Sequence, residues 1–426
     1  CVDIGIDPKS PDAPQDMKSA VEKFFDVENG EISELTSNER GKLADDIQII
    51  ATGDRYTPSI LIYDNGVGQN HTDFKDTFLS LHNNNKADIQ FVQGKYNMGS
   101  TGSVVFCGQK KYQLIGSRSN NQNNKDTAFG FTLVRRHPLK DSDNAKTSWY
   151  EYFCPNKEIP FFEQDHFDFG LLNRQFENGS IVKLYSYEFP TNSKGAITTD
   201  LYRDLNQYLF DLPIPLRVVE RRDYASEKDK SKVILGNRAR ILNDGNQNVE
   251  KQITFNIDSS LGNFNLPINV IVFKKGVDER EYIKRKSLIF TINGQIHASE
   301  GWSYISQELN FKLIKKELLI IVDCTEIPVQ IRQDLFMANR THVKTAKVYE
   351  TLHKEITEQL KQSKELRRIN NERKDAILRS SSDKNLIKEL MSSLPADQDL
   401  LNLLKNDGIL NFLNPTGNNS SNVSHN

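Results

Sequence analysis

The sequence lacks the features of a disulfide-rich, zinc-binding or membrane-spanning protein. It has four cysteines, at Cys1, Cys107, Cys154 and Cys324. They follow no CxxC or Cys/His spacing, so they predict neither a zinc site nor a disulfide framework. No apolar run approaches the roughly 18 residues of a membrane helix, and no signal-peptide pattern is visible. We therefore predict a cytoplasmic protein with reduced thiols and no membrane partner.

The sequence also lacks an excess of charge of either sign. Its 55 basic and 57 acidic residues give a formal net charge of -2, so no overall field attracts nucleic acid or an anionic membrane. The 426 residues are 37% hydrophobic and 26% charged, which is ordinary for a chain with real cores and predicts two or three domains. The charge is balanced and no DNA-binding motif is recognised, so the sequence does not show whether the protein acts on another protein or on nucleic acid.

Strand patterns dominate the first part of the chain. The segments "DDIQIIATG" and "PSILIYDNG" predict two strands joined by a turn, and "HTDFKDTFLSLHNNNK" has apolar residues at helical spacing. Further strands are predicted at "GSVVFCG", "KYQLIGSRS", "AFGFTLVRR" and "GSIVKLYSYEF". We predict a mixed α and β domain over residues 45–190, preceded by an insertion or partial N-terminal region at 1–44.

A second α and β domain is predicted at residues 200–345. The helix-like "LYRDLNQYLFDL" precedes strand patterns at "QITFNID", "INVIVFKKG", "SLIFTINGQIH" and "LLIIVDCT". Residues 341–379 predict one long amphipathic helix, and residues 346–412 are assigned to a C-terminal helical segment. The polar end, 413–426, is predicted to be disordered. The predicted fold class is therefore α+β.

The segment "DNGVGQN", residues 64–70, directly follows the apolar run "SILIY". A carboxylate at the tip of a buried strand, Asp64, can accept hydrogen bonds from an exocyclic amine such as that of adenine. The glycines Gly66 and Gly68 let the backbone turn tightly and let a flat ligand lie against it. A simple Asp-Asn-Gly turn is the competing interpretation, since such turns are common.

A glycine-rich segment follows in "FVQGKYNMGSTGSVVFCG". Its glycines permit close approach of phosphates, while backbone amides, hydroxyls and a lysine can hold anionic oxygens. A helix that begins within it would add a favourable dipole. The residues concerned are Gly94, Lys95, Asn97, Met98, Gly99, Ser100, Thr101, Gly102 and Ser103. The alternative is that this segment is a surface loop that binds no ligand.

A third motif, "ENGSIVKLYSY", places Gly179 and Ser180 at the start of a strand. In this order, "DNGVG", "QGKYNMGSTGS" and "NGSIVKL" resemble the DxGxG box, the ATP-lid glycine box and the G-T-x-I strand motif of the GHKL ATPase superfamily. That superfamily includes DNA gyrase B, 90-kilodalton heat-shock chaperones, histidine kinases and MutL. The resemblance covers about residues 45–190 and implies a GHKL (Bergerat) α/β sandwich that binds ATP.

The resemblance also implies roles for single residues. It assigns Asp64 to the adenine amine and makes Gly66 and Gly68 the floor of the base pocket. Residues 94–103 become the phosphate-facing lid. The implied cofactors are ATP and Mg²⁺, and the implied working cycle is nucleotide-dependent formation of a homodimer.

Three positions depart from the superfamily's pattern or leave alternatives open. Asn97 stands where the family often has glycine, and Ser180 replaces the usual threonine while keeping the hydroxyl. Lys86, after "TFLSLHNNN", is similar to a lysine near the lid of the chaperones. It contacts phosphate or it caps the C-terminus of a helix.

The superfamily carries an E-x-x-x-N helix whose glutamate activates water and whose asparagine holds Mg²⁺. Glu34 and Asn38 have that spacing, which makes Glu34 a candidate general base and Asn38 a candidate Mg²⁺ ligand. However, the segment around them is polar and lacks the customary Asp-Ala. Because the chain begins with Cys1, the alternative is that this helix precedes it, and that residues 1–44 are an insertion in a fragment that hydrolyses nothing.

The predicted second domain resembles the transducer domain of the superfamily, which has a ribosomal-protein-like α/β fold and sends a basic residue to the γ-phosphate. The similar segments are "LIFTINGQIH" and "LLIIVDCTEIPVQIRQDLFMANRTHVK". Arg332 is the nearest counterpart of the chaperones' catalytic-loop arginine, with Arg340 and Lys344 as alternatives. The plain alternative is that all three are solvated basic residues near the start of a helix.

Three functions remain in competition. The first is an ATPase that couples hydrolysis to lid closure and dimerisation. The second is a histidine kinase, which should have a phospho-acceptor helix before the ATP-binding domain and no transducer after it. The third is a nucleotide-binding module that does not hydrolyse ATP.

Overall fold

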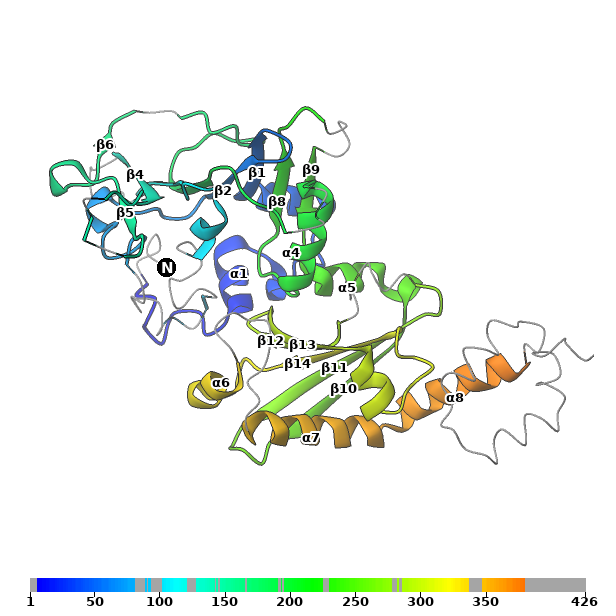
Figure 1. Ribbon diagram of the computed structural model, residues 1–426. Coiled ribbons are helices and arrows are strands. Elements are labelled where there is room, and N and C mark those ends of the chain that lie inside the picture. The colour runs from blue at the N-terminus through cyan, green and yellow to red at the C-terminus, as the bar shows by residue number, and fades with distance from the viewer. Residues whose placement is uncertain are drawn as a thin grey trace, which may run out of the picture. The chain divides into compact units, whose positions relative to one another are not determined.

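The computed structural model divides the chain into two compact units, Cys1–Gly245 with Asn293–Gln295, and Asn246–Ile292 with Ile296–Asn426 (Figure 1). It describes residues 6–80, 89, 91–92, 102–120, 128–141, 143–144, 146–164, 167–190, 193, 195–224, 230–277, 282, 286–336 and 347–379. Both units contain helices and a sheet, so the prediction of mixed α and β structure is confirmed. Within these ranges, every helix is too short or too polar to cross a bilayer.

The first unit is built on a nine-stranded sheet in the order β5-β4-β3-β7-β2-β1-β8-β9, with β6 beside β4. Of the described strand pairs, β1 and β8 are parallel and the others are antiparallel. The strands are β1 (Ile47–Gly53), β2 (Pro58–Asp64), β3 (Gln113–Arg118), β4 (Phe129–Arg136), β5 (Tyr150–Tyr152), β6 (Phe161–Phe162), β7 (Gly179–Leu184), β8 (Leu216–Glu220) and β9 (Ser231–Ile234).

Both faces of the central strands are buried. Successive side chains of a strand point to opposite faces, so Ile60 and Leu61 of β2 belong to two separate hydrophobic clusters. The cluster that contains Ile60 includes residues of α4 and α5. The cluster that contains Leu61 is packed by the aromatic and leucine side chains of residues 167–176. This burial explains why β2 reads as a continuous apolar run rather than an alternating one.

Short helices connect and cover the strands of this unit. They are α1 (Met17–Phe25), η2 (Glu28–Gly30), α2 (Ser37–Ala44), η3 (His71–Asp73), η4 (Val104–Phe106), η5 (Pro155–Lys157), η6 (Ile197–Leu201), α4 (Tyr202–Tyr208) and α5 (Gly236–Asn248). Capping boxes begin two of them, Asp16 with Ser19 in α1 and Thr36 with Glu39 in α2.

The first unit ends later than we expected from the sequence. We placed the domain boundary near residue 190, but the compact unit continues to Gly245. The reason is that β8 pairs with β1 and β9 pairs with β8, which extends the same sheet. A parallel pair between segments so far apart in the chain leaves no local mark in the sequence.

The second unit contains a five-stranded sheet in the order β10-β11-β14-β12-β13 (Figure 1). Its elements are β10 (Val249–Asp258), β11 (Asn265–Phe273), β12 (Lys286–Ile292), β13 (Gln295–Gly301), η9 (Tyr304–Glu308), β14 (Leu318–Asp323), α6 (Val329–Leu335), α7 (Lys347–Gln362) and α8 (Lys364–Arg379). Leu352, Ile356 and Leu360 recur every four residues of α7 and pack into the core over the sheet.

The long helix predicted at 341–379 is two helices over its described part. Ser363 separates α7 from α8, and its buried hydroxyl accepts a hydrogen bond from Leu366 N at 3.3 Å. Leu366 and Ile369 continue the core contacts of α7. Apolar spacing alone could not reveal this break, because the core-facing stripe resumes directly after it.

Candidate functional site

Three neighbouring strands place polar side chains at one edge of the first sheet. Strand β7 lies between β2 and β3. In these antiparallel pairs, Ser180 stands opposite Asp64 on one side and opposite Ser117 on the other. The end of β2, the start of β7 and the end of β3 therefore meet, although they are far apart in the sequence.

The carboxylate of Asp64 is held at the tip of β2. Its Oδ1 accepts a hydrogen bond from Gly66 N at 3.0 Å, which makes a tight turn directly after the strand. An alanine Cβ at Gly66 would lie 2.6 Å from that same oxygen. Asn178 donates from Nδ2 to the Gly66 carbonyl at 2.7 Å and ties the turn to the residues before β7.

Two glycines bring the loop after β2 against the neighbouring strands. Gly68 has φ +63°, and a Cβ there would lie 1.8 Å from the carbonyl oxygen of Arg118. Gly179 has φ +100°, and a Cβ there would lie 2.0 Å from the carbonyl oxygen of Asp64. Both positions need the conformational freedom and the small size of glycine. The sequence predicted a tight turn here with a flat ligand against the glycines, whereas the Cβ side of Gly68 is filled by the Arg118 carbonyl.

Ser117 also belongs to this candidate site, although the sequence did not predict it. The Ser117 hydroxyl is fully buried, donates to Gly179 O at 2.8 Å, and accepts from Gln69 N at 2.9 Å. Its oxygen is also 3.1 Å from the oxygen of Ser180. Because the one hydroxyl hydrogen of Ser117 points to Gly179, Ser180 is the donor of this pair. The lone pairs of the Ser180 hydroxyl can then accept hydrogen bonds, as the Asp64 carboxylate can.

A second polar network holds Asn65, the residue that follows Asp64. The hydroxyl of Tyr63 donates to Asn65 Oδ1 at 3.3 Å, and Asn65 Nδ2 donates to Asp46 Oδ1 at 3.0 Å. Arg174 pairs with the same carboxylate of Asp46. Burial raises the pKa of Tyr63 to about 12, so its phenol stays protonated and acts as a donor near neutral pH. This network fixes the residue that follows Asp64.

Only the end of the predicted phosphate-binding segment belongs to the described residues. Gly102 has open space where a side chain would stand, and Ser103 Oγ is 3.4 Å from Gln113 Nε2 of β3. The other predicted lid residues lie outside the described residues, namely Gly94, Lys95, Asn97, Met98, Gly99, Ser100 and Thr101. Lys86 lies outside them as well.

Glu34 and Asn38 do not share one helix. The capping box of Thr36 and Glu39 starts α2 at Ser37, so Glu34 precedes the helix and Asn38 lies in its first turn. The side chains of Glu34 and Asn38 are both exposed. The sequence carries the signal for this start in "TSNE", which has the T-x-x-E capping pattern. The arrangement differs from a buried helix that presents both residues to one ligand.

Arg332 lies on α6 of the second unit, directly after the loop that follows β14. It is half-buried, and within the described part of the chain its guanidinium has no hydrogen bond or ion pair. Cys324, the residue after β14, is fully buried, and burial raises the pKa of its thiol well above the usual value. The alternatives Arg340 and Lys344 lie outside the described residues.

No protein-family model matches the chain, and the search of curated proteins found no match.

Proposed function

We propose that the chain binds ATP at the edge of the first sheet where β2, β7 and β3 meet. The observation that carries the proposal is the pairing of Asp64 with Ser180 on adjacent strands. "DNGVG" and "NGSIVKL" are distant in the sequence, yet they supply neighbouring acceptor groups. The glycines Gly66, Gly68 and Gly179 let the turn and the adjacent strands pack closely around these groups. This is the arrangement that the resemblance to GHKL ATPases implies.

The donor and acceptor pattern favours adenine over guanine. The exocyclic amine of adenine donates hydrogen bonds, and both the Asp64 carboxylate and the Ser180 oxygen accept them. Guanine has a carbonyl oxygen at the corresponding position. This oxygen would face the Asp64 carboxylate, so two hydrogen-bond acceptors would meet without a donor. An unsatisfied buried polar group costs about 1–3 kcal/mol. The phosphates and Mg²⁺ then belong toward the glycine-rich segment that ends at Gly102 and Ser103.

We extend the proposal to hydrolysis that drives closure of the lid and formation of a homodimer. In this scheme residues 94–103 cover the phosphates, and a basic residue of the second unit reaches the γ-phosphate. The exposure of Glu34 outside α2 favours a second candidate function, a nucleotide-binding module without turnover. A histidine kinase is the least favoured, because the five-stranded sheet of the second unit follows the proposed ATP-binding unit.

Calorimetric titration tests the binding function directly. We expect ATP to bind at least roughly 10-fold more tightly than GTP, because one lost hydrogen-bonded pair is worth about 1.4 kcal/mol or more. Phosphate release measured in parallel, with and without EDTA, separates the hydrolysing protein from the non-hydrolysing module. Equal affinities for ATP and GTP, or no binding of either, would refute the proposed base recognition.

Arg332→Ala should lower ATP turnover by about 100-fold in the full-length protein and leave ADP affinity unchanged. A guanidinium aimed at the γ-phosphate stabilises charge mainly in the transition state, and ADP lacks that phosphate. Arg332→Lys should retain part of the rate, since it keeps the charge but loses the bidentate geometry. Turnover and ADP affinity are measured side by side.

The matched control is Arg367→Ala, an exposed arginine of α8 in the same unit. Arg340→Ala and Lys344→Ala test the two alternatives by the same assays. If all three site variants hydrolyse ATP at the parental rate, the second unit has no catalytic part in the reaction.

A further inference from the structure

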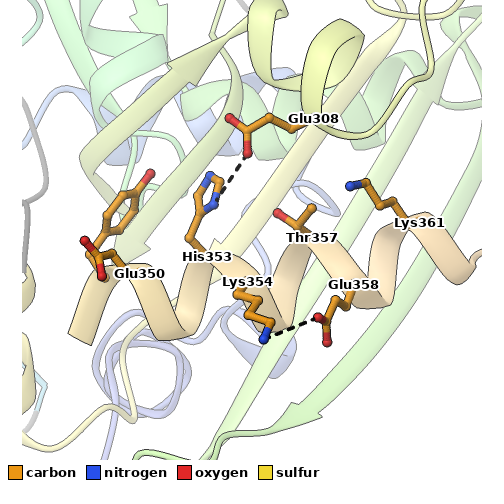
Figure 2. A pocket seen from close by; sticks show the side chains of 8 residues that line it. Glu308, Glu350, His353, Lys354, Thr357, Glu358 and Lys361 are labelled. Carbon is orange, nitrogen blue, oxygen red and sulfur yellow. Dashed lines mark ion pairs between the residues drawn. The ribbon is translucent and has the colours of Figure 1, made fainter. Parts of the chain in front are cut away.

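A histidine and two glutamates meet in the second unit, beside α7. Glu300 lies near the end of β13, Glu308 ends η9, and His353 lies in the middle of α7. Figure 2 shows His353 pointing away from the axis of α7 toward Glu308. The three side chains therefore come from three different elements, which only the fold brings together.

The side chains of the triad lie close together, with the two carboxylates at different nitrogens of the ring. His353 Nε2 is 3.2 Å from Glu300 Oε1, and His353 Nδ1 is 3.7 Å from Glu308 Oε2, so an ion on Nε2 requires the Glu308 side chain to turn toward it. One ligand atom can be chosen from each residue so that all three lie within 4.8 Å of one another. Bonds of about 2.0–2.2 Å to a tetrahedral ion separate ligand atoms by roughly 3.3 Å. The side chain of Glu308 is 47% exposed, which leaves it room to rotate toward such an ion.

Neighbouring aromatic residues fix the triad in place. The ring of His353 lies 5.1 Å from the rings of both Tyr304 and Tyr349. The hydroxyl of Tyr349 donates a hydrogen bond to Glu300 Oε1. Such a bond to a ligating carboxylate is a common supporting contact at metal sites, because it orients the ligand.

Two carboxylates lie beside one half-buried imidazole ring. Glu300 lies against Nε2 of His353, and Glu308 lies against Nδ1. Three potential ligand groups from three elements therefore surround one small space, in which a cation would meet two negatively charged groups.

One ring nitrogen lies where an ion could bind. His353 Nε2 is buried and, within the described part of the chain, has no hydrogen bond of acceptable geometry, although Glu300 Oε1 is only 3.2 Å away. An ion held between this nitrogen and the Glu300 carboxylate would give both groups a partner.

We infer that Glu300, Glu308 and His353 form a binding site for one divalent transition-metal ion of the Zn²⁺ type. An imidazole nitrogen with two carboxylate oxygens suits Zn²⁺ better than Mg²⁺ or Ca²⁺, which prefer oxygen ligands alone. The bound ion would link β13, η9 and α7 in the second unit. This site is separate from the proposed ATP site in residues and in ligand.

Two members of the triad, Glu308 and His353, line a shallow hollow of about 370 Å³. The charged residues that line it beyond the triad are Glu350, Lys354, Glu358 and Lys361, which Figure 2 shows along α7. Lys354 is 3.9 Å from Glu358, so this pair is internally balanced. The hollow gives water or a further ligand access to the remaining coordination positions of the ion.

The test is a Zn²⁺ titration of the full chain in competition with a fluorescent chelator. We expect the parent to bind one equivalent at the triad, and Glu308→Gln and His353→Gln to weaken that binding by at least about 100-fold. Tyr349→Phe should weaken it by about 10-fold, as supporting contacts do. Zn²⁺ should also raise the melting temperature of the parent but not of His353→Gln.

The matched control is Glu358→Gln, which removes an exposed carboxylate of the same helix and the same hollow but lies outside the triad. It should bind Zn²⁺ as the parent does, and circular dichroism should show that every variant is folded. The inference is overturned if the parent binds no Zn²⁺, if the triad variants bind it unchanged, or if Glu358→Gln loses it equally. Unchanged binding in the triad variants would place the ion on other histidines or on the thiols.

Discussion

Asp64→Asn is expected to weaken ATP binding by roughly 10- to 150-fold while leaving the fold intact. Asparagine keeps an Oδ1 that can accept the hydrogen bond from Gly66 N, so the turn after β2 should persist. It also places an amide donor where the carboxylate would accept from the adenine amine. A lost charged hydrogen bond is worth about 1.5–3 kcal/mol, which corresponds to roughly 10- to 150-fold in affinity.

Calorimetric titration with ATP measures this effect, and circular dichroism reports the fold. The matched control is Asp54→Asn in the turn at the other end of the same β1–β2 hairpin. Asp54 accepts hydrogen bonds from Tyr56 N at 2.8 Å and Thr57 N at 3.1 Å, so its carboxylate also holds a turn. The control should bind ATP as the parent does. Unchanged affinity in Asp64→Asn, or an equal loss in both variants, would remove Asp64 from the proposed site.

Gly68→Ala is expected to remove ATP binding and to lower the melting temperature by at least about 4 °C. The left-handed conformation at φ +63° costs an alanine about 1–2 kcal/mol. A Cβ only 1.8 Å from the Arg118 carbonyl oxygen also forces the loop away from β3. About 2 kcal/mol lowers the melting temperature of a domain of this size by roughly 4–8 °C. The displaced loop would no longer form the floor of the base pocket.

Gly41→Ala is the matched control for this substitution. Gly41 lies inside α2, and a Cβ there would meet only the Arg217 guanidinium at 3.5 Å, an ordinary contact distance. Alanine is favoured over glycine in a helix interior, so the control should melt at or slightly above the parental temperature. Differential scanning calorimetry and ATP titration measure both variants. A Gly68→Ala protein that melts with the parent and binds ATP normally contradicts the assigned role of this glycine.

The sequence by itself determined two strand ends of the first unit, although the strand predicted at "GSVVFCG" is the short helix η4 in the structure. The apolar run before "DNGVG" predicted the strand that ends at Asp64, and "NGSIVKL" predicted the strand that begins at Gly179. Gly68 was expected to let the backbone turn tightly, and its positive φ agrees. These features depend on residues that are neighbours in the chain, so a short stretch of sequence carries the whole signal.

Local patterns also gave expectations that the structure changed. The spacing of Glu34 and Asn38 suggested a shared helix, but the capping box at Thr36 starts α2 between them. Apolar spacing predicted one helix at 341–379, whereas Ser363 divides the described part into α7 and α8. A periodic pattern reports which side of a helix faces the core. It does not report where hydrogen bonding of the backbone is interrupted.

Only the tertiary structure decided which distant residues meet. The register of β7 between β2 and β3 places the hydroxyls of Ser117 and Ser180 beside the Asp64 turn, and nothing in "KYQLIGSRS" distinguishes Ser117 from another strand serine. In the same way, the packing of α7 against β13 and η9 brings His353 to two glutamates from other elements. Strand register and helix packing are set by the complementarity of whole buried faces, so the sequence around each residue could not specify these contacts.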